Sequence, residues 1–266
     1  MLNHEPLAIL QLTDTHIMAS SEDTLLGVNT AYYFKAVLES VIHSGRKFDL
    51  CLVTGDIAQD PVISSYQYLL KQLERLDIPC ICLPGNHDDL EIMRQVFSTD
   101  TINCRKQLIT GQWQIIALNS QVPDSAGGYV SDGELTFLEN CLENNKELNA
   151  LIAVHHHSVP TGSSWMDTMI IENARSIFDI LDKYPNAKAV INGHIHQEMD
   201  IQLNACRILT TPSTCFQFKP LSDHFSLDDT SPGYRWLHLY ENGLIDSGIV
   251  RIPEKISGLR TNNEGY

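Results

Sequence analysis

The sequence predicts an α/β fold in which parallel strands alternate with helices and an antiparallel portion follows. Up to about residue 195, short apolar runs alternate with longer segments whose apolar residues recur every three or four positions. Such an alternation implies parallel strands joined by right-handed crossover helices. After Ile201 the chain changes to short strand-like runs, the last two of which are joined by Glu241-Asn242-Gly243, a sequence typical of hairpin turns.

Each element follows from its own pattern. Short apolar runs that suit buried strands occupy residues 7–12, 50–53, 80–83, 113–118, 151–154 and 189–191. Segments with helical periodicity occupy residues 30–44, 66–76, 133–142 and 172–184. Asn29 or Thr30 can cap the first of these helices, and Ser64 or Ser65 can cap the second. The later strands are expected at residues 207–211, 235–240 and 244–252, with a functional loop at 217–233.

Composition limits the possible partners and the domain count. The chain has 266 residues and a formal charge of −15, which argues against nonspecific binding to nucleic acid or to an anionic membrane. Its seven cysteines are odd in number and scattered, as expected for core residues in a reducing cytoplasm. No run resembles a signal peptide or a membrane span. We expect one cytoplasmic domain over residues 1–256, with a loose tail at 257–266.

Potential metal ligands follow five separate predicted strands. They are Asp14 and His16, Asp56, Asn86 and His87, the run His155 to His157, and His194 and His196. A single Gly-Asp after a strand is most often an ordinary turn, and a single histidine is most often a hydrogen-bonded polar residue. Agreement at five strand ends favours a metal site instead, because these ends meet at one edge of an α/β sheet. Carboxylate, amide and imidazole ligands without thiolates suit manganese, iron or zinc.

These motifs, in this order, resemble the five conserved blocks of the calcineurin-like metallophosphoesterases. The matching segments are Asp14-Thr15-His16, Gly55-Asp56, Gly85-Asn86-His87-Asp88, the histidine run, and Gly193-His194-Ile195-His196. Flanking segments resemble the bacterial class III 3′,5′-cyclic AMP phosphodiesterases, at residues 26–30, 193–198, 211–215, 217–220 and 231–235. The resemblance implies a four-layer αββα sandwich of two mixed β-sheets flanked by helices.

The resemblance also implies two metal ions per chain, iron or manganese, with zinc as a further possibility. The first ion would be held by Asp14, His16, Asp56 and His196. The second would be held by Asp56, Asn86, His156 and His194, so that Asp56 bridges the two ions. His155 remains an alternative to His156, because Ser158 stands where the family pattern has a proline.

The implied chemistry is hydrolysis of a phosphodiester. Two divalent ions and two carboxylates leave a positive site, and ions about 3.5 to 4 Å apart share a hydroxide that attacks phosphorus. The expected catalytic residues are Asp56 and His87, and His87 either binds the phosphate, donates a proton to the departing 3′ oxygen, or orients a ligand. Contacts to the substrate are expected from His16, Asp56, Asn86, His87, His156 and His196.

The resemblance to the class III branch implies 3′,5′-cyclic AMP as substrate and 5′-AMP as product, for a monomer or homodimer. Residues 163–167 and 216–219 offer aromatic faces for the base, although core packing would explain them equally well. Two alternatives remain. One is another phosphoesterase of the same family, acting on glycerophosphodiesters, 2′,3′-cyclic nucleotides or monoesters. The other is a binding module without catalysis, although all seven expected ligand positions are filled.

Overall fold

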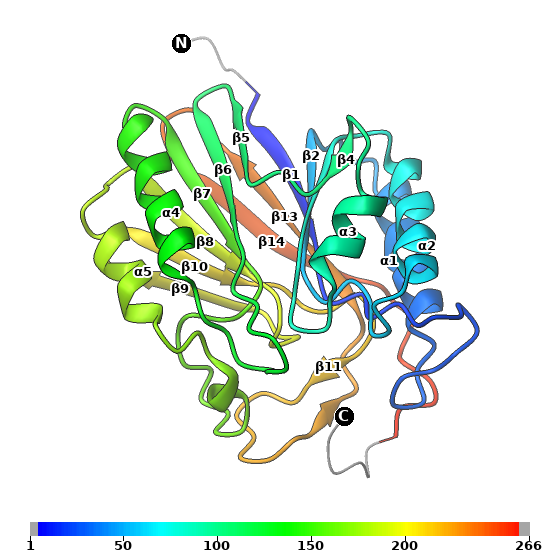
Figure 1. The fold of residues 1–266 in the computed structure, drawn as a ribbon. Coiled ribbons are helices and arrows are strands. Elements are labelled where there is room, and N and C mark those ends of the chain that lie inside the picture. Colours follow the sequence, from blue (N-terminus) through cyan, green and yellow to red (C-terminus); the bar gives the residue numbers. More distant parts are fainter. Residues whose placement is uncertain (1–4, 261–266) are drawn as a thin grey trace.

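The computed structural model describes residues 5–260 and confirms the predicted sandwich. Two six-stranded mixed sheets pack face to face, and helices cover the outer face of each (Figure 1). Three apolar layers hold the four structural layers together. The middle layer contains alternate residues of both sheets, including Leu50 and Leu52 from one sheet and Leu151 and Ala153 from the other. Successive side chains of a strand point to opposite faces of the sheet. The central strands are covered by helices on one face and by the other sheet on the second face, so they are apolar on both faces.

The first sheet has the strand order β14-β13-β1-β2-β3-β4. These strands are β1 (Leu7–Leu12), β2 (Leu50–Thr54), β3 (Cys80–Leu83), β4 (Ile102–Asn103), β13 (Gly233–Leu239) and β14 (Ile245–Arg251). β1 to β4 run parallel, as their crossover connections require, and β13 joins β1 antiparallel.

The second sheet has the strand order β5-β6-β7-β8-β10-β9. These strands are β5 (Gln107–Thr110), β6 (Trp113–Leu118), β7 (Asn149–Val154), β8 (Ala187–Asn192), β9 (Met199–Leu203) and β10 (Cys206–Thr210). The four central strands are parallel, and β5 and β9 form antiparallel edges. β11 (Gln217–Phe218) and β12 (Leu227–Asp228) form a separate small hairpin.

The helices pack on both outer faces of the sandwich (Figure 1). The first sheet is covered by α1 (Thr30–His43), α2 (Ile63–Leu73) and α3 (Leu90–Val96), and the second by α4 (Asp132–Asn144) and α5 (Ala174–Leu181). Two short 3₁₀ turns, η1 (Glu74–Leu76) and η2 (Met166–Met169), complete the set.

The predicted cap of α1 is confirmed, and that of α2 is wrong. The Asn29 side chain accepts a hydrogen bond of 2.7 Å from Tyr32 N, which satisfies one free amide of the first turn. α2 begins after Val62 without a side-chain cap. Ser65 already lies in the first turn, where its hydroxyl donates to the carbonyls of Asp60 and Met18, so it anchors a loop instead.

The structure adds several short elements to those predicted, namely α3, β4, β5, β9 and the β11–β12 hairpin within the predicted loop 217–233. Of the predicted tail, residues 257–260 contact the domain, because Ser257 N donates to the Tyr33 hydroxyl and Arg260 N donates to Leu26 O. Residues 261–266 lie outside the described part. All seven cysteines are free, as expected. Within residues 5–260, none of the helices has the length and apolar character needed to span a membrane.

Candidate metal centre

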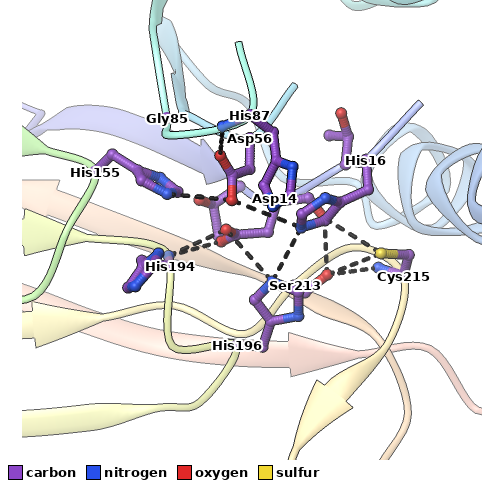
Figure 2. Close-up of polar contacts among 12 residues, drawn as sticks. Asp14, His16, Asp56, Gly85, His87, His155, His194, His196, Ser213 and Cys215 are labelled. Carbon is purple, nitrogen blue, oxygen red and sulfur yellow. Dashed lines mark hydrogen bonds and ion pairs between the residues drawn. The ribbon is translucent and has the colours of Figure 1, made fainter. Parts of the chain in front are cut away.

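The predicted ligands meet where the parallel strands of both sheets end. Asp14 and His16 follow β1, Asp56 follows β2, and Asn86 follows β3 in the first sheet. The run from His155 follows β7 in the second sheet, and His194 and His196 follow β8. Figure 2 shows the side chains of His16, Asp56, His155 and His196 pointing toward a common centre.

The backbone at this centre is strained. Among residues 5–260, ten residues other than glycine have a positive φ, and five of them carry predicted ligands. These five are Asp14, His16, Asp56, His194 and His196. A positive φ costs free energy for any residue with a Cβ, so it persists where the surroundings enforce it, and such residues cluster at functional sites. The strain therefore supports a functional role for these side chains.

Glycines allow close packing at the same place, both within the first sheet and between the two sheets. A Cβ on Gly85 would collide with the Asp56 carboxylate and backbone nitrogen. A Cβ on Gly55, which has φ of +91°, would overlap the imidazole of His155. Both positions therefore require glycine if Asp56 and His155 are to reach the centre.

Two histidines at the first candidate site present unprotonated nitrogens to each other. His16 Nδ1 lies 2.9 Å from Gln59 Oε1, and His196 Nδ1 lies 2.8 Å from Phe216 O. Both partners are acceptors, so each neutral imidazole carries its proton on Nδ1 and has a lone pair on Nε2. The two Nε2 atoms lie only 3.2 Å apart. Converging lone pairs need a cation between them, and the nearby Asp14 carboxylate, 3.5 Å from His196 Nε2, suits one.

The second candidate site repeats this arrangement around His155. Its Nδ1 lies 2.8 Å from Thr54 O, so Nε2 faces the centre. There it lies 3.3 Å from Asp56 Oδ2 and 3.3 Å from Asn86 Oδ1. Burial alone would lower the pKa of His155, but the charge of Asp56 and the hydrogen bond to it raise that pKa to about 9. Without a metal ion, a proton on Nε2 therefore fills the place between these acceptors.

His194 and His156 complete this second group of ligand atoms. Ring nitrogens of His155, His156 and His194 lie within 4.8 Å of one another. Both nitrogens of His194 are buried without a hydrogen-bond partner, which is costly unless a metal ion or another group satisfies them. Burial lowers the pKa of His194 well below its usual value, so the ring is neutral and able to ligate. His156 Nδ1 contacts the Ser120 hydroxyl at 2.7 Å.

Several supporting residues were not given a role from the sequence. Gln59 sets the tautomer of His16, and the Thr54 carbonyl sets that of His155. Asp88 accepts hydrogen bonds from the backbone nitrogens of Gly85, Ile57 and Ala58, which fixes the loops after β2 and β3. Burial raises the pKa of Asp88 to about 6. Asp88 is the last residue of the Gly-Asn-His-Asp motif, and this motif is the feature of the sequence that could have indicated its supporting role.

A cavity of about 390 Å³ opens beside the second candidate site. Its wall includes Asp56, Asn86, His87 and His194. The backbone nitrogen of His87 donates to Asp56 Oδ1 at 3.0 Å. The His87 side chain is part of the cavity wall. A phosphoester in this cavity would touch the candidate ligands and His87 together.

Comparisons with known proteins agree with this geometry. Residues 7–198 match the family model described as calcineurin-like phosphoesterase. The chain belongs to this family. It is 40% identical to the 3′,5′-cyclic adenosine monophosphate phosphodiesterase CpdA of Escherichia coli K12, over 97% of this chain and 94% of that protein. It is 37% identical to the CpdA protein of Pseudomonas aeruginosa over 97% and 94% of the two chains.

A solved structure shows the same fold at low sequence identity. A dimetal phosphatase from Danio rerio superimposes with a TM-score of 0.66 and 12% identity, over 93% of this chain and 99% of that one. The protein is thus a calcineurin-like phosphoesterase whose Asp and His clusters suit a dinuclear metal site. All seven predicted ligands lie at this site, and His155 lies there with them.

Proposed function

We propose that this enzyme hydrolyses 3′,5′-cyclic AMP to 5′-AMP at a dinuclear metal centre. The observation that carries the chemistry is the pair of imidazole Nε2 atoms of His16 and His196, 3.2 Å apart with their Nδ1 protons already donated. The choice of substrate is supported by CpdA relatives at 35 to 40% identity over nearly the whole chain. We also propose a cytoplasmic, monomeric or homodimeric protein with one domain over residues 1–256.

The proposed ligands divide into two sets that share Asp56. One ion would be held by Asp14, His16, Asp56 and His196. The other would be held by Asp56, Asn86, His194 and a histidine of the run that follows β7. The contacts of His155 Nε2 with Asp56 and Asn86, each at 3.3 Å, favour His155 over His156 for that last position. The oxygen and imidazole donors favour manganese or iron, with zinc as the next choice.

Bound divalent ions would supply charge neutralisation for the phosphodiester and an activated water nucleophile. The residues of the chain would do the remaining work. Asp56 would position both ions, and the cavity would orient the cyclic phosphate toward them. His87 would bind the phosphate or transfer a proton to the departing 3′ oxygen, because its ring lines the cavity beside Asn86. His16, Asn86, His156 and His196 would border the phosphate.

A substrate panel tests this proposal. Manganese-loaded and iron-loaded enzyme is assayed with 3′,5′-cyclic AMP, 2′,3′-cyclic AMP, a glycerophosphodiester and an aryl phosphomonoester. The highest kcat/KM is expected for 3′,5′-cyclic AMP, since specificity is a ratio of kcat/KM values. A higher value for the glycerophosphodiester or the monoester would contradict 3′,5′-cyclic AMP as the preferred substrate and would favour another phosphoesterase activity of the same family. Inactivity on all four with both ions bound would favour a binding module.

A further inference from the structure

The wall of the cavity also includes three aromatic side chains, Trp165, Phe218 and Phe225, which we call the aromatic box. Their rings meet edge to face, with centroids 5.1 Å apart for Trp165 and Phe218, and 5.3 Å for Trp165 and Phe225. Phe218 and Phe225 lie 5.7 Å apart. Aromatic rings that line a cavity offer faces and edges for a flat apolar ligand.

The aromatic box is directly connected to the candidate metal centre. Phe218 stacks on the imidazole of His196 with centroids 4.4 Å apart. The same cavity is therefore lined both by metal-ligand candidates and by aromatic rings. A ligand that fits both has an anionic group and a flat ring held a short distance apart, as a nucleotide has.

Two segments from different parts of the chain build the aromatic box. Trp165 lies in the connection between β7 and α5, and Phe218 and Phe225 lie in the β11–β12 hairpin. Hydrogen bonds join these segments, because the Ser164 hydroxyl donates to Asp223 at 2.8 Å and Ser222 N donates to the Ser163 hydroxyl at 3.1 Å. The box is thus held in place before a ligand arrives, which lowers the entropic cost of binding.

The remaining residues around the box are mostly apolar. They are Ala126, Met166, Thr168 and Met169. The Thr168 hydroxyl already donates to Trp165 O at 2.6 Å. Among the described residues that line the cavity, none has a charged side chain apart from the candidate metal centre and His87. Recognition here would depend on contact with a ring face, which favours the larger of two rings.

Building on the function proposed above, we propose that the aromatic box holds the nucleobase and makes the enzyme prefer purine over pyrimidine cyclic nucleotides. Stacking of one base on an aromatic side chain changes affinity by about 10-fold to 100-fold when the side chain is removed. The diester itself would be recognised by the candidate metal centre and His87, so removal of an aromatic side chain should not affect a substrate without a base.

The test compares 3′,5′-cyclic AMP with the same cyclic ribose phosphate lacking a base. Trp165→Leu and Phe225→Leu should each lower kcat/KM for 3′,5′-cyclic AMP by about 10-fold to 100-fold and leave the base-free substrate within about twofold. Phe137→Leu is the matched control, because Phe137 lies on α4 and packs against Lys106 outside the cavity. For the unmodified enzyme, 3′,5′-cyclic CMP should be a poorer substrate than 3′,5′-cyclic AMP.

The proposal would be overturned if the variants lost kcat/KM equally for both substrates. It would also be overturned if the unmodified enzyme had equal kcat/KM values for 3′,5′-cyclic AMP and the base-free substrate. A second measurement does not need turnover. Binding of 5′-AMP should change the fluorescence of Trp165, ribose 5-phosphate should not, and Trp165→Phe should remove the change. If the unmodified enzyme hydrolyses no cyclic nucleotide, the proposed function fails, while the fluorescence change still decides whether the box binds a base.

Discussion

At the scale of single residues, the candidate site is a cluster of carboxylate oxygens and imidazole nitrogens. Protons and metal ions compete for these atoms. Asp56 and its hydrogen bond raise the pKa of His155 to about 9 against the effect of burial, whereas burial keeps His194 neutral. Metal binding at pH 7 must therefore displace the His155 proton. Since the protonated form predominates below about pH 9, apparent affinity should rise with pH up to that value and level off above it.

Calorimetry checks this expectation. Metal-free enzyme is titrated with Mn²⁺ at pH 6, 7 and 8, in buffers of different ionisation enthalpy. We expect close to one proton released per chain, and an affinity that rises by up to about tenfold per pH unit. His155→Gln should abolish the release. An affinity independent of pH over this range would contradict the assignment.

Asp56 is the proposed ligand of both ions, so its removal should lower the metal content more than any other single ligand change. Asp56→Ala should bind neither ion stoichiometrically, whereas Asn86→Ala should keep about one ion per chain, because Asn86 belongs to one set only. Elemental analysis of the purified variants measures this. Asp179→Ala is the control, since Asp179 is an exposed residue of α5. Two ions retained by Asp56→Ala would refute the bridging role.

His87 should affect turnover without affecting metal content, since its ring lines the cavity and its neighbour Asn86 is the proposed ligand. His87→Ala should keep both ions and lose about 10²-fold to 10⁴-fold in kcat. If His87 donates a proton, the loss should shrink for a diester with an aryloxide leaving group of low pKa. An equal loss for both diesters would indicate phosphate binding instead, and a loss of metal would contradict both roles.

The sequence indicates the candidate residues because each follows a strand in a recognisable motif. It leaves the choice between His155 and His156 open, because that choice depends on which imidazole meets distant groups. His155 is oriented by the carbonyl of Thr54, 101 residues earlier in the chain. Likewise, the tautomer of His16 depends on Gln59, 43 residues away, and a motif carries no information about such contacts.

At the scale of elements, the cap of α1 offers a direct stability test. Asn29→Ala removes the hydrogen bond from Tyr32 N, together with the one that the Asn29 amide donates to Ser21 O, and should lower the free energy of unfolding by about 1 kcal/mol. Gln67→Ala is the control, because Gln67 is an exposed residue inside α2. Urea denaturation measures both. If Gln67→Ala cost as much as Asn29→Ala, capping would not be the cause.

The sequence predicts nine strands, each to within two residues of its observed ends, and most of them are buried parallel strands, which form continuous apolar runs bounded by turns. The short elements were missed for physical reasons. α3 has only seven residues and its periodicity covers less than two turns. β11 and β12 have two residues each and exist because they pair with each other. Pairing across a loop leaves no pattern in either segment alone.

At the scale of the whole molecule, the C-terminal strands are divided between the sheets. β9 and β10 extend the second sheet, whereas β13 and β14 return to the first. The sequence predicts antiparallel strands there but not this division, because hairpin chemistry says nothing about which existing edge a strand joins. The division brings Arg235 of β13 against β9 and β10, so that one side chain links the two sheets.

Arg235 is buried and serves as a polar clamp between the sheets. Its guanidinium donates to Thr210 O at 2.6 Å, to Met199 O at 3.3 Å and to the Thr211 hydroxyl at 3.2 Å, all from the second sheet or its end. Burial lowers its pKa to about 10, so it stays protonated at pH 7. Charged donors to buried carbonyls make strong hydrogen bonds, and their removal leaves the acceptors unsatisfied.

Arg235→Met should therefore lower the free energy of unfolding by about 2 to 4 kcal/mol, because it leaves the carbonyls of Met199 and Thr210 buried without these donors. Arg175→Met is the matched control, since the side chain of Arg175 is 86% exposed and pairs with Asp179 on the surface of α5. Urea denaturation of both metal-free variants gives the comparison without interference from ligand binding. A similar midpoint for the two variants would show that the apolar layer holds the sheets together without the clamp, whereas a large shift for Arg235→Met alone is expected if the guanidinium fixes their relative position.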